Sequence, residues 1–171
     1  MDHLWSPWRY TYVSQASKDS TCIFCEALKR NDDRSSFILY RGQHNFIILN
    51  RYPYTTGHAM IAPYHHIADL AQTRPEALAE MMTLCQRLEH ALAELYQPEG
   101  FNLGMNLGRC AGAGVTGHLH MHLLPRWSGD TSFMTTVAET RIEPEILDTT
   151  YDKLKPYFEP PSRPFSSHRV G

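Results

Sequence analysis

The sequence predicts an α+β fold, in which an antiparallel sheet carries one long helix and a C-terminal helix. Short apolar runs separated by turn residues account for much of the chain, and they do not alternate strictly with helices as in a parallel α/β fold. One stretch near the middle has the i, i+3, i+4, i+7 spacing of a helix. The length of 171 residues favours one domain, which we place at residues 1–158. Residues 159–171 are rich in Pro and Ser and read as a flexible tail or as a partner-binding arm.

The strands are expected on both sides of the long helix. Three apolar runs precede it and two follow it, at residues 37–40, 46–50, 58–63, 101–108 and 118–126. The Gly and Asn residues between the first two runs suit a hairpin turn.

The long helix is predicted from Arg74 to Tyr96, because its apolar positions form one face and its charged positions the other. Thr73 and Glu76 have the spacing of a capping box at its start. A short helix is expected after the Cys22-Ile-Phe-Cys25 motif, and a last helix over residues 144–158.

The composition excludes several functional classes. Sixteen Lys and Arg residues against eighteen Asp and Glu give a net charge of −2, so a broad basic surface for nucleic acid is not expected. We find neither an apolar run of about 18 residues nor a signal peptide, so no membrane partner is expected either. Four cysteines without an export signal are expected to be thiols or metal ligands in the cytoplasm.

Ten histidines stand out, and three of them alternate at His118, His120 and His122. In a strand, alternate side chains share a face, so the three imidazoles are expected on one side of the sheet. Groups with a pKa near neutrality gathered in this way suit nucleophilic and acid–base catalysis. A solvated sheet face and a metal site made of the three histidines remain as alternatives.

The loop before these histidines is almost free of side chains. It contains Gly112, Ala113 and Gly114, whose backbone amides are able to approach an anion closely. An ordinary flexible hairpin is the alternative, but next to three histidines the loop favours phosphate binding. An imidazole is able to attack phosphorus and form a phosphoramidate, which divides one substitution into two easier ones.

The segment His118-Leu-His-Met-His-Leu-Leu124 resembles the signature of the histidine triad superfamily of nucleotide hydrolases and transferases. The segment from Asn50 to Pro63 is similar to the upstream segment of that family. Three further motifs resemble the branch that contains diadenosine tetraphosphate phosphorylases: Trp5–Arg9, Cys22–Cys25 and Pro125–Met134. The resemblance covers residues 4–150 and implies a sheet of about five strands.

The resemblance also implies roles for individual residues. His120 would be the nucleophile that forms a nucleotidyl-histidine, and His122 would contact the phosphate and assist the leaving group. His118 and His58 would orient and polarise the site. Asn50 would hold a ribose hydroxyl. The phosphates would be held by the residues Asn106, Gly112, Ala113 and Gly114, together with His122.

One departure from the family pattern lies in the same loop. Many members have Gly-Gln followed by Ser or Thr, where this chain has Ala113-Gly114-Val115. The missing polar side chain leaves room for inorganic phosphate as a second substrate.

Cys22 and Cys25 have the spacing of half a zinc site, and a redox pair or two buried thiols are the alternatives. Some bacterial members of the superfamily resemble this chain in combining such a pair with two histidines. The matching residues are His66 and His118, which implies a structural zinc ion with a Cys2His2 ligand set.

The histidine pattern and the family resemblance together imply an enzyme that cleaves the α-phosphate linkage of adenine mono- or dinucleoside polyphosphates through a nucleotidyl-histidine. The reaction is either hydrolysis or transfer, for example phosphorolysis of diadenosine tetraphosphate to ADP and ATP. The alternative is a non-catalytic, zinc-stabilised nucleotide-binding or interaction protein. The resemblance also implies a homodimer, with the aromatic N-terminus and the long helix as candidate contacts.

Overall fold

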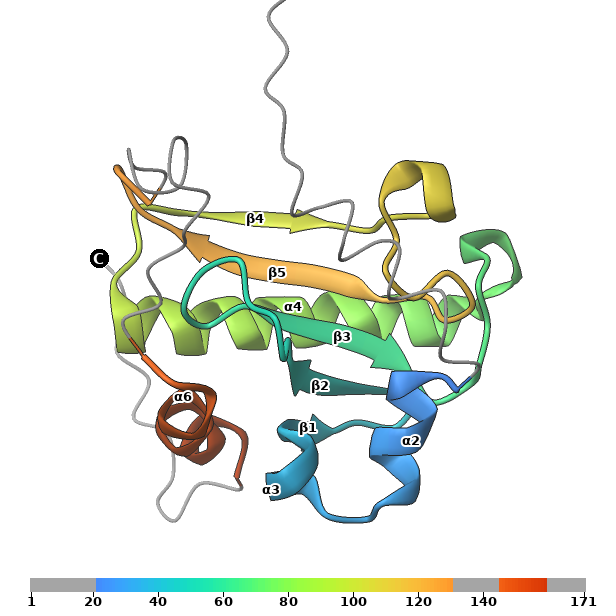
Figure 1. The fold of residues 1–171 in the computed structure, drawn as a ribbon, viewed down its shortest axis with the longest axis horizontal. Helices are drawn as coiled ribbons and strands as arrows, with labels where there is room; N and C mark the ends of the chain where they lie inside the picture. Colours follow the sequence, from blue (N-terminus) through green and yellow to red (C-terminus); the bar gives the residue numbers. More distant parts are fainter. Residues whose placement is uncertain (1–20, 131–144, 160–171) are drawn as a thin grey trace, which may run out of the picture.

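A five-stranded antiparallel sheet with the strand order β1-β2-β3-β5-β4 forms the centre of the computed structural model, which describes residues 21–130 and 145–159 (Figure 1). The strands are β1 (Ile38–Arg41), β2 (Asn45–Leu49), β3 (Ala59–Pro63), β4 (Gly100–Gly104) and β5 (Met121–Arg126). The predicted α+β class, the hairpin and the strand number are confirmed. Three segments lie outside the described residues: the N-terminal aromatic motif, residues 131–134 of the 125–134 motif, and the tail beyond residue 159. The domain boundary therefore stays a prediction.

The helices are α2 (Ile23–Lys29), α3 (Asp33–Ser36), α4 (Pro75–Tyr96) and α6 (Leu147–Leu154), with short 3-10 helices at η1 (Leu70–Gln72), η2 (Arg109–Ala111) and η3 (Lys155–Phe158). The predicted long helix is confirmed, but its capping box is wrong. The Thr73 hydroxyl donates to the Asp69 carbonyl of the preceding turn (2.9 Å), so Arg74 stands at the N-cap without a side-chain cap. Across the described part of the chain, none of the helices has the length and apolar character needed to cross a membrane.

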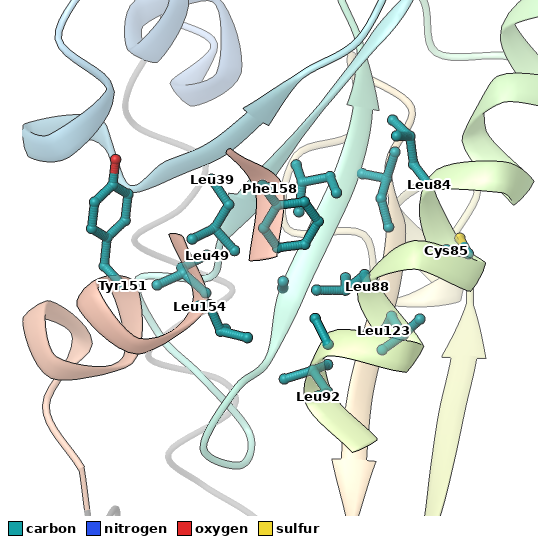
Figure 2. Close-up of a cluster of buried hydrophobic side chains, with 14 of the residues drawn as sticks. Leu39, Leu49, Leu84, Cys85, Leu88, Leu92, Leu123, Tyr151, Leu154 and Phe158 are labelled. Atoms are coloured by element: carbon teal, nitrogen blue, oxygen red, sulfur yellow. The ribbon is translucent and has the colours of Figure 1, made fainter. Parts of the chain in front are cut away.

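The two faces of the sheet carry separate apolar clusters, because successive strand residues point in opposite directions. On one face, Leu39, Ile47, Leu49 and Leu123 pack against Leu88 of α4 and against α6 and η3 (Figure 2). On the other face, Phe46, Ile48 and Met60 pack with Phe24 of α2. We call the second set the α2-side cluster; it comprises Phe24, Ala27, Ile38, Phe46, Ile48, Met60 and Ala62.

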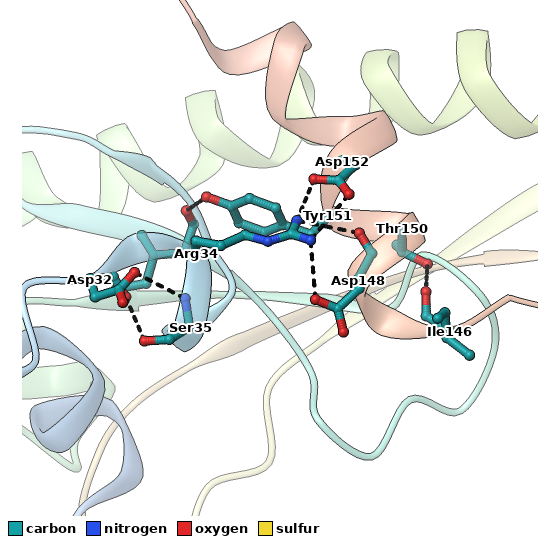
Figure 3. Close-up of polar contacts among 9 residues, drawn as sticks. Asp32, Arg34, Ser35, Ile146, Asp148, Thr150, Tyr151 and Asp152 are labelled. Atoms are coloured by element: carbon teal, nitrogen blue, oxygen red, sulfur yellow. Dashed lines mark hydrogen bonds and ion pairs between the residues drawn. The ribbon is translucent and has the colours of Figure 1, made fainter.

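Polar contacts connect α6 with α3. Arg34 of α3 pairs with Asp148 (3.1 Å) and with Asp152, and its guanidinium lies 4.8 Å from the centre of the Tyr151 ring (Figure 3). Single exposed ion pairs contribute little to stability, but here one guanidinium joins two carboxylates and a ring. Arg34 thereby connects two segments more than one hundred residues apart.

The last strand is shorter than predicted, and this changes the position of the histidines. β5 begins at Met121, so only His122 of the three lies in a strand, and His118 and His120 precede it. The antiparallel ladder with β3 ends at the Ile61–Met121 pair. Two residues beyond, Pro63 has no N–H to donate, and its carbonyl accepts from the His118 ring instead (2.8 Å).

Candidate active site

The sheet register places the site on the face opposite α4. Met60 lies opposite both Ile48 and His122, so these three side chains share one face with the α2-side cluster. His58 precedes Met60 by two residues and Asn50 follows Ile48 by two, which places both on that same face. Strand pairing therefore brings together residues that are more than sixty positions apart in the sequence.

Three of the four predicted catalytic histidines form a connected group. The ring centroids of His120 and His122 lie 4.8 Å apart, and those of His58 and His122 lie 5.1 Å apart. His58 Nε2 and His122 Nδ1 are at hydrogen-bonding distance, 2.9 Å. The fourth, His118, has its ring turned toward the cysteines.

The hydrogen bonds assign the tautomers of His58 and His122. The backbone N–H of Tyr54 donates to His58 Nδ1 (3.1 Å), so neutral His58 carries its proton on Nε2. That Nε2–H donates to His122 Nδ1, which leaves the His122 proton on Nε2. We call this chain of hydrogen bonds, from the Tyr54 N–H through His58 to His122, the relay. It makes the Nε2 atom of His122 a hydrogen-bond donor.

The orientation of His120 follows from a different partner. Its Nδ1 lies 2.7 Å from the backbone carbonyl oxygen of His118, and a carbonyl only accepts hydrogen bonds. His120 therefore carries its proton on Nδ1, and its Nε2 keeps a lone pair. A hydrogen-bond donor on His122 and a lone pair on His120 thus stand on adjacent rings of the same face.

Burial keeps these imidazoles neutral. Desolvation lowers the pKa of His120, although its bond to the His118 carbonyl acts in the opposite direction. Desolvation, with the nearby His120 as a lesser cause, lowers the pKa of His122 to about 4. Both rings are therefore uncharged at neutral pH, and the lone pair of His120 is available.

A second constellation lies beside the first. The ligand atoms of Cys22, Cys25, His66 and His118 all lie within 4.8 Å of one another. Sulfur-to-nitrogen distances of 3.2 Å for Cys22–His118, 3.7 Å for Cys25–His118 and 3.4 Å for Cys25–His66 connect them. These four residues, brought from three separate segments, are able to hold a metal ion.

The donor set fits zinc. Tetrahedral zinc with Zn–S of about 2.3 Å and Zn–N of about 2.0 Å requires sulfur-to-nitrogen edges of about 3.5 Å, near the three observed distances. His118 donates from Nε2 to the Pro63 carbonyl, so its Nδ1 keeps the lone pair that faces the sulfurs. Burial, then the neighbouring Cys22, raises the pKa of the Cys25 thiol, and a bound cation would reverse that effect.

Two of the predicted nucleotide-binding residues, Asn50 and Asn106, lie outside the connected group of histidines. The Asn50 side chain accepts from the Tyr52 N–H (2.9 Å) and lies 3.4 Å from His58 Nδ1. Asn106 is partly buried between β4 and η2. Their contacts with a nucleotide stay predictions.

The loop that contains Gly112, Ala113 and Gly114, which we call the glycine loop, forms hydrogen bonds within itself. The N–H of Gly112 donates to the Arg109 carbonyl (3.0 Å), and that of Ala113 donates to the Gly108 carbonyl (3.3 Å). Gly112 has φ of 91°, a conformation that glycine adopts without strain. Two of the amides expected to hold phosphate are therefore engaged, and Gly114 is exposed.

Sequence reasoning missed three contributors to the site. Tyr54 supplies the N–H that sets the His58 tautomer, and its ring lies 4.7 Å from the His58 ring. The Pro63 carbonyl orients His118, and Phe24 packs on both His118 and His120. Only Phe24 carried a usable signal, as an aromatic residue between two candidate metal ligands.

A comparison of the sequence with models of known protein families identifies the family. The family model described as HIT domain matches residues 31–129, so the chain belongs to the HIT domain family. The resemblance seen in the sequence is thereby confirmed.

Individual relatives extend this result. The chain is 32% identical over 157 residues, 88% of its own length, to a Mycobacterium tuberculosis protein called AP-4-A phosphorylase, of which it covers 80%. It is 29% identical to a protein called adenylylsulfatase HINT3 from Arabidopsis thaliana, over 69% of this chain and 58% of that one. A solved structure of a zinc-bound histidine triad family protein from Mycobacterium smegmatis superimposes with a TM-score of 0.65 at 29% identity, over 80% of this chain and 92% of that one.

Proposed function

We propose that this protein transfers the adenylyl group of adenine dinucleoside polyphosphates through a covalent intermediate on His120. The observation that carries the proposal is the His120 ring: its Nδ1–H is held by the His118 carbonyl at 2.7 Å, and its Nε2 keeps a lone pair. This bond leaves the Nε2 lone pair free for attack, and restricting the motion of the ring lowers the entropic part of the barrier.

In the first step, His120 Nε2 attacks the α-phosphorus, a P–N bond forms, and the P–O bond to the leaving polyphosphate breaks. The leaving oxygen takes the electron pair, so diadenosine tetraphosphate would release ATP and leave AMP on His120. The His122 Nε2–H would donate to a phosphate oxygen where negative charge develops. The His118 carbonyl would stabilise the positive charge on the adenylylated imidazole, because it accepts the Nδ1–H.

In the second step, an acceptor oxygen attacks phosphorus and the P–N bond breaks. Inorganic phosphate as the acceptor gives ADP, and water gives AMP. We favour phosphate, because the M. tuberculosis relative is called a phosphorylase and because Val115 stands where many family members have a hydroxyl.

The test is turnover of diadenosine tetraphosphate with and without inorganic phosphate, with the nucleotides separated by chromatography. ADP with ATP, formed only when phosphate is present, is the expected result. AMP with ATP in both conditions would replace phosphorolysis by hydrolysis. Adenylyl sulfate, suggested by the A. thaliana relative, serves as a second substrate that shares the adenylyl group.

His120→Ala should reduce turnover at least about a thousandfold, as expected when a nucleophile is removed. His90→Ala is the matched control, because His90 is an exposed histidine of α4 paired with Glu94 (3.3 Å). Substantial activity in His120→Ala, or no adenylyl-His120 trapped from the wild type, would reject the mechanism. The latter result would favour the non-catalytic nucleotide-binding alternative.

We also propose that the Cys22, Cys25, His66 and His118 site holds a structural zinc ion. Bound zinc would join α2 to the segment that carries the histidines, and it would need no part in the chemistry. The M. smegmatis structure supports zinc as the metal.

We further propose a homodimer in which β4 takes part. β4 is an edge strand, its Leu103 is 46% exposed, and Leu107 shortly after it is 45% exposed. Light scattering coupled to gel filtration would measure the mass, and a monomer at micromolar concentration would reject the dimer.

A further inference from the structure

We propose that Phe24, the aromatic residue between Cys22 and Cys25, is a positioning residue for His120. The inference rests on the proposed function, because it assigns Phe24 to the orientation of the proposed nucleophile. It is carried by the position of one buried ring that lies against both a candidate metal ligand and the nucleophile.

A single hydrogen bond leaves the His120 ring incompletely fixed. The bond from Nδ1 to the His118 carbonyl holds one atom of the ring, but the plane is still able to rotate about that contact. His122 approaches the ring at 4.8 Å with an interplanar angle of 72°. Phe24 lies 5.1 Å from the same ring at 44°. Together these neighbours restrict the plane, and so set the direction of the Nε2 lone pair.

The Phe24 ring is itself firmly held. Its side chain is 0% exposed, and it belongs to the α2-side cluster. It packs edge-on against Phe46, with ring centroids 6.3 Å apart. Cys22 stands at the N-cap of α2 and Cys25 in its first turn, so a metal ion on both sulfurs would fix the helix that presents the ring.

Phe24 also lies 5.1 Å from the ring of His118. The metal constellation is therefore connected to His120 by two paths, through the His118 backbone carbonyl and through the Phe24 ring. A residue with no exposed surface is unable to touch a bound nucleotide. Its loss should consequently lower kcat and leave KM nearly unchanged.

Phe24→Leu removes the flat ring and keeps an apolar side chain. We expect kcat to fall by roughly ten- to a hundredfold, the order of effect that a misplaced reacting group produces, with KM within about twofold. Phe24→Tyr keeps the ring, so its kcat should stay within about threefold of wild type even where its buried hydroxyl lowers the melting temperature.

Phe46→Leu is the matched control. Phe46 is also 0% exposed and belongs to the same cluster, but its ring contacts among the described residues are with Phe24 and Tyr64. Its melting temperature should fall as far as that of Phe24→Leu, but its kcat should fall by no more than about threefold, because Phe24 still lies against His120 and is still held by α2 and the rest of the α2-side cluster. Zinc content is measured for every variant, and each should retain the metal content of the wild type.

Equal kcat values for Phe24→Leu and Phe46→Leu would overturn the inference, and so would a Phe24→Tyr variant as slow as Phe24→Leu. Zinc lost from Phe24→Leu along with turnover would also overturn it, because the ring would then act through the metal. If the wild type itself does not turn over either adenylyl substrate, the proposed function is what fails.

Discussion

Acidification should destabilise the wild-type protein more than a His122→Gln variant. The pKa of His122 is lowered from 6.5 to about 4 by burial, so between these values the unfolded chain binds a proton that the folded protein excludes. The contribution of His122 to the free energy of unfolding is fully present above pH 6.5 and is lost as the pH falls toward 4. At pH 5 the two pKa values give a loss of about 2 kcal/mol. Since the ring is only partly buried, solvent screening reduces the expected loss to about 1 kcal/mol.

The assay is urea unfolding of both proteins at pH 7, 6 and 5 in the same buffer. His118 and His120, whose pKa values burial also lowers, are present in both proteins, so the difference isolates His122. His90→Gln, which removes an exposed histidine, should behave as the wild type does. If the free energy of unfolding changed with pH in the same way for wild type and His122→Gln, the argument that burial keeps the His122 ring uncharged would be refuted.

Three further outcomes are expected. Cys22→Ser should lose the bound zinc measured by elemental analysis, whereas Cys85→Ser should keep it, because Cys85 lies in the core and burial raises its thiol pKa to about 11. Leu88→Ala, at a fully buried position of α4, should lower the free energy of unfolding by about 2–5 kcal/mol in urea. His58→Leu should lower kcat by about ten- to a hundredfold, since it removes the donor that sets the His122 tautomer, whereas His58→Gln should retain more activity. Equal kcat values for the two His58 variants would contradict the relay.

The fold was largely predictable because its signals are local. The spacing of apolar residues in α4 and the continuous apolar run of β2 each depend on one segment, and both predicted the correct element. The four-residue helix α3 was missed, since it is too short to show a periodicity. The capping box failed because the Thr73 hydroxyl has a competing acceptor in the preceding turn.

The residue types of the site and the face that they share were predictable, but its detailed geometry was not. That His118, His120 and His122 face one side followed from their spacing, but the early end of the β5 ladder depends on Pro63 in a neighbouring strand. The His58 tautomer depends on a backbone amide four residues away, at Tyr54, which no side-chain pattern reveals. The glycine loop was predicted from its composition, but composition does not show that two of its amides bond within the loop.

The spacing of two between the histidines has a reason beyond strand alternation. The His118 ring is turned toward the cysteine sulfurs, and the carbonyl of the same residue accepts the Nδ1–H of the ring two positions later, that of His120. One residue therefore takes part in the candidate metal site through its side chain and orients the proposed nucleophile through its backbone. A shift of His120 by one position would point its ring toward the α4 face, where Leu123 is packed, and away from this carbonyl. The one-residue gap thus places the His120 ring on the correct face of the sheet and within reach of the carbonyl that fixes its tautomer.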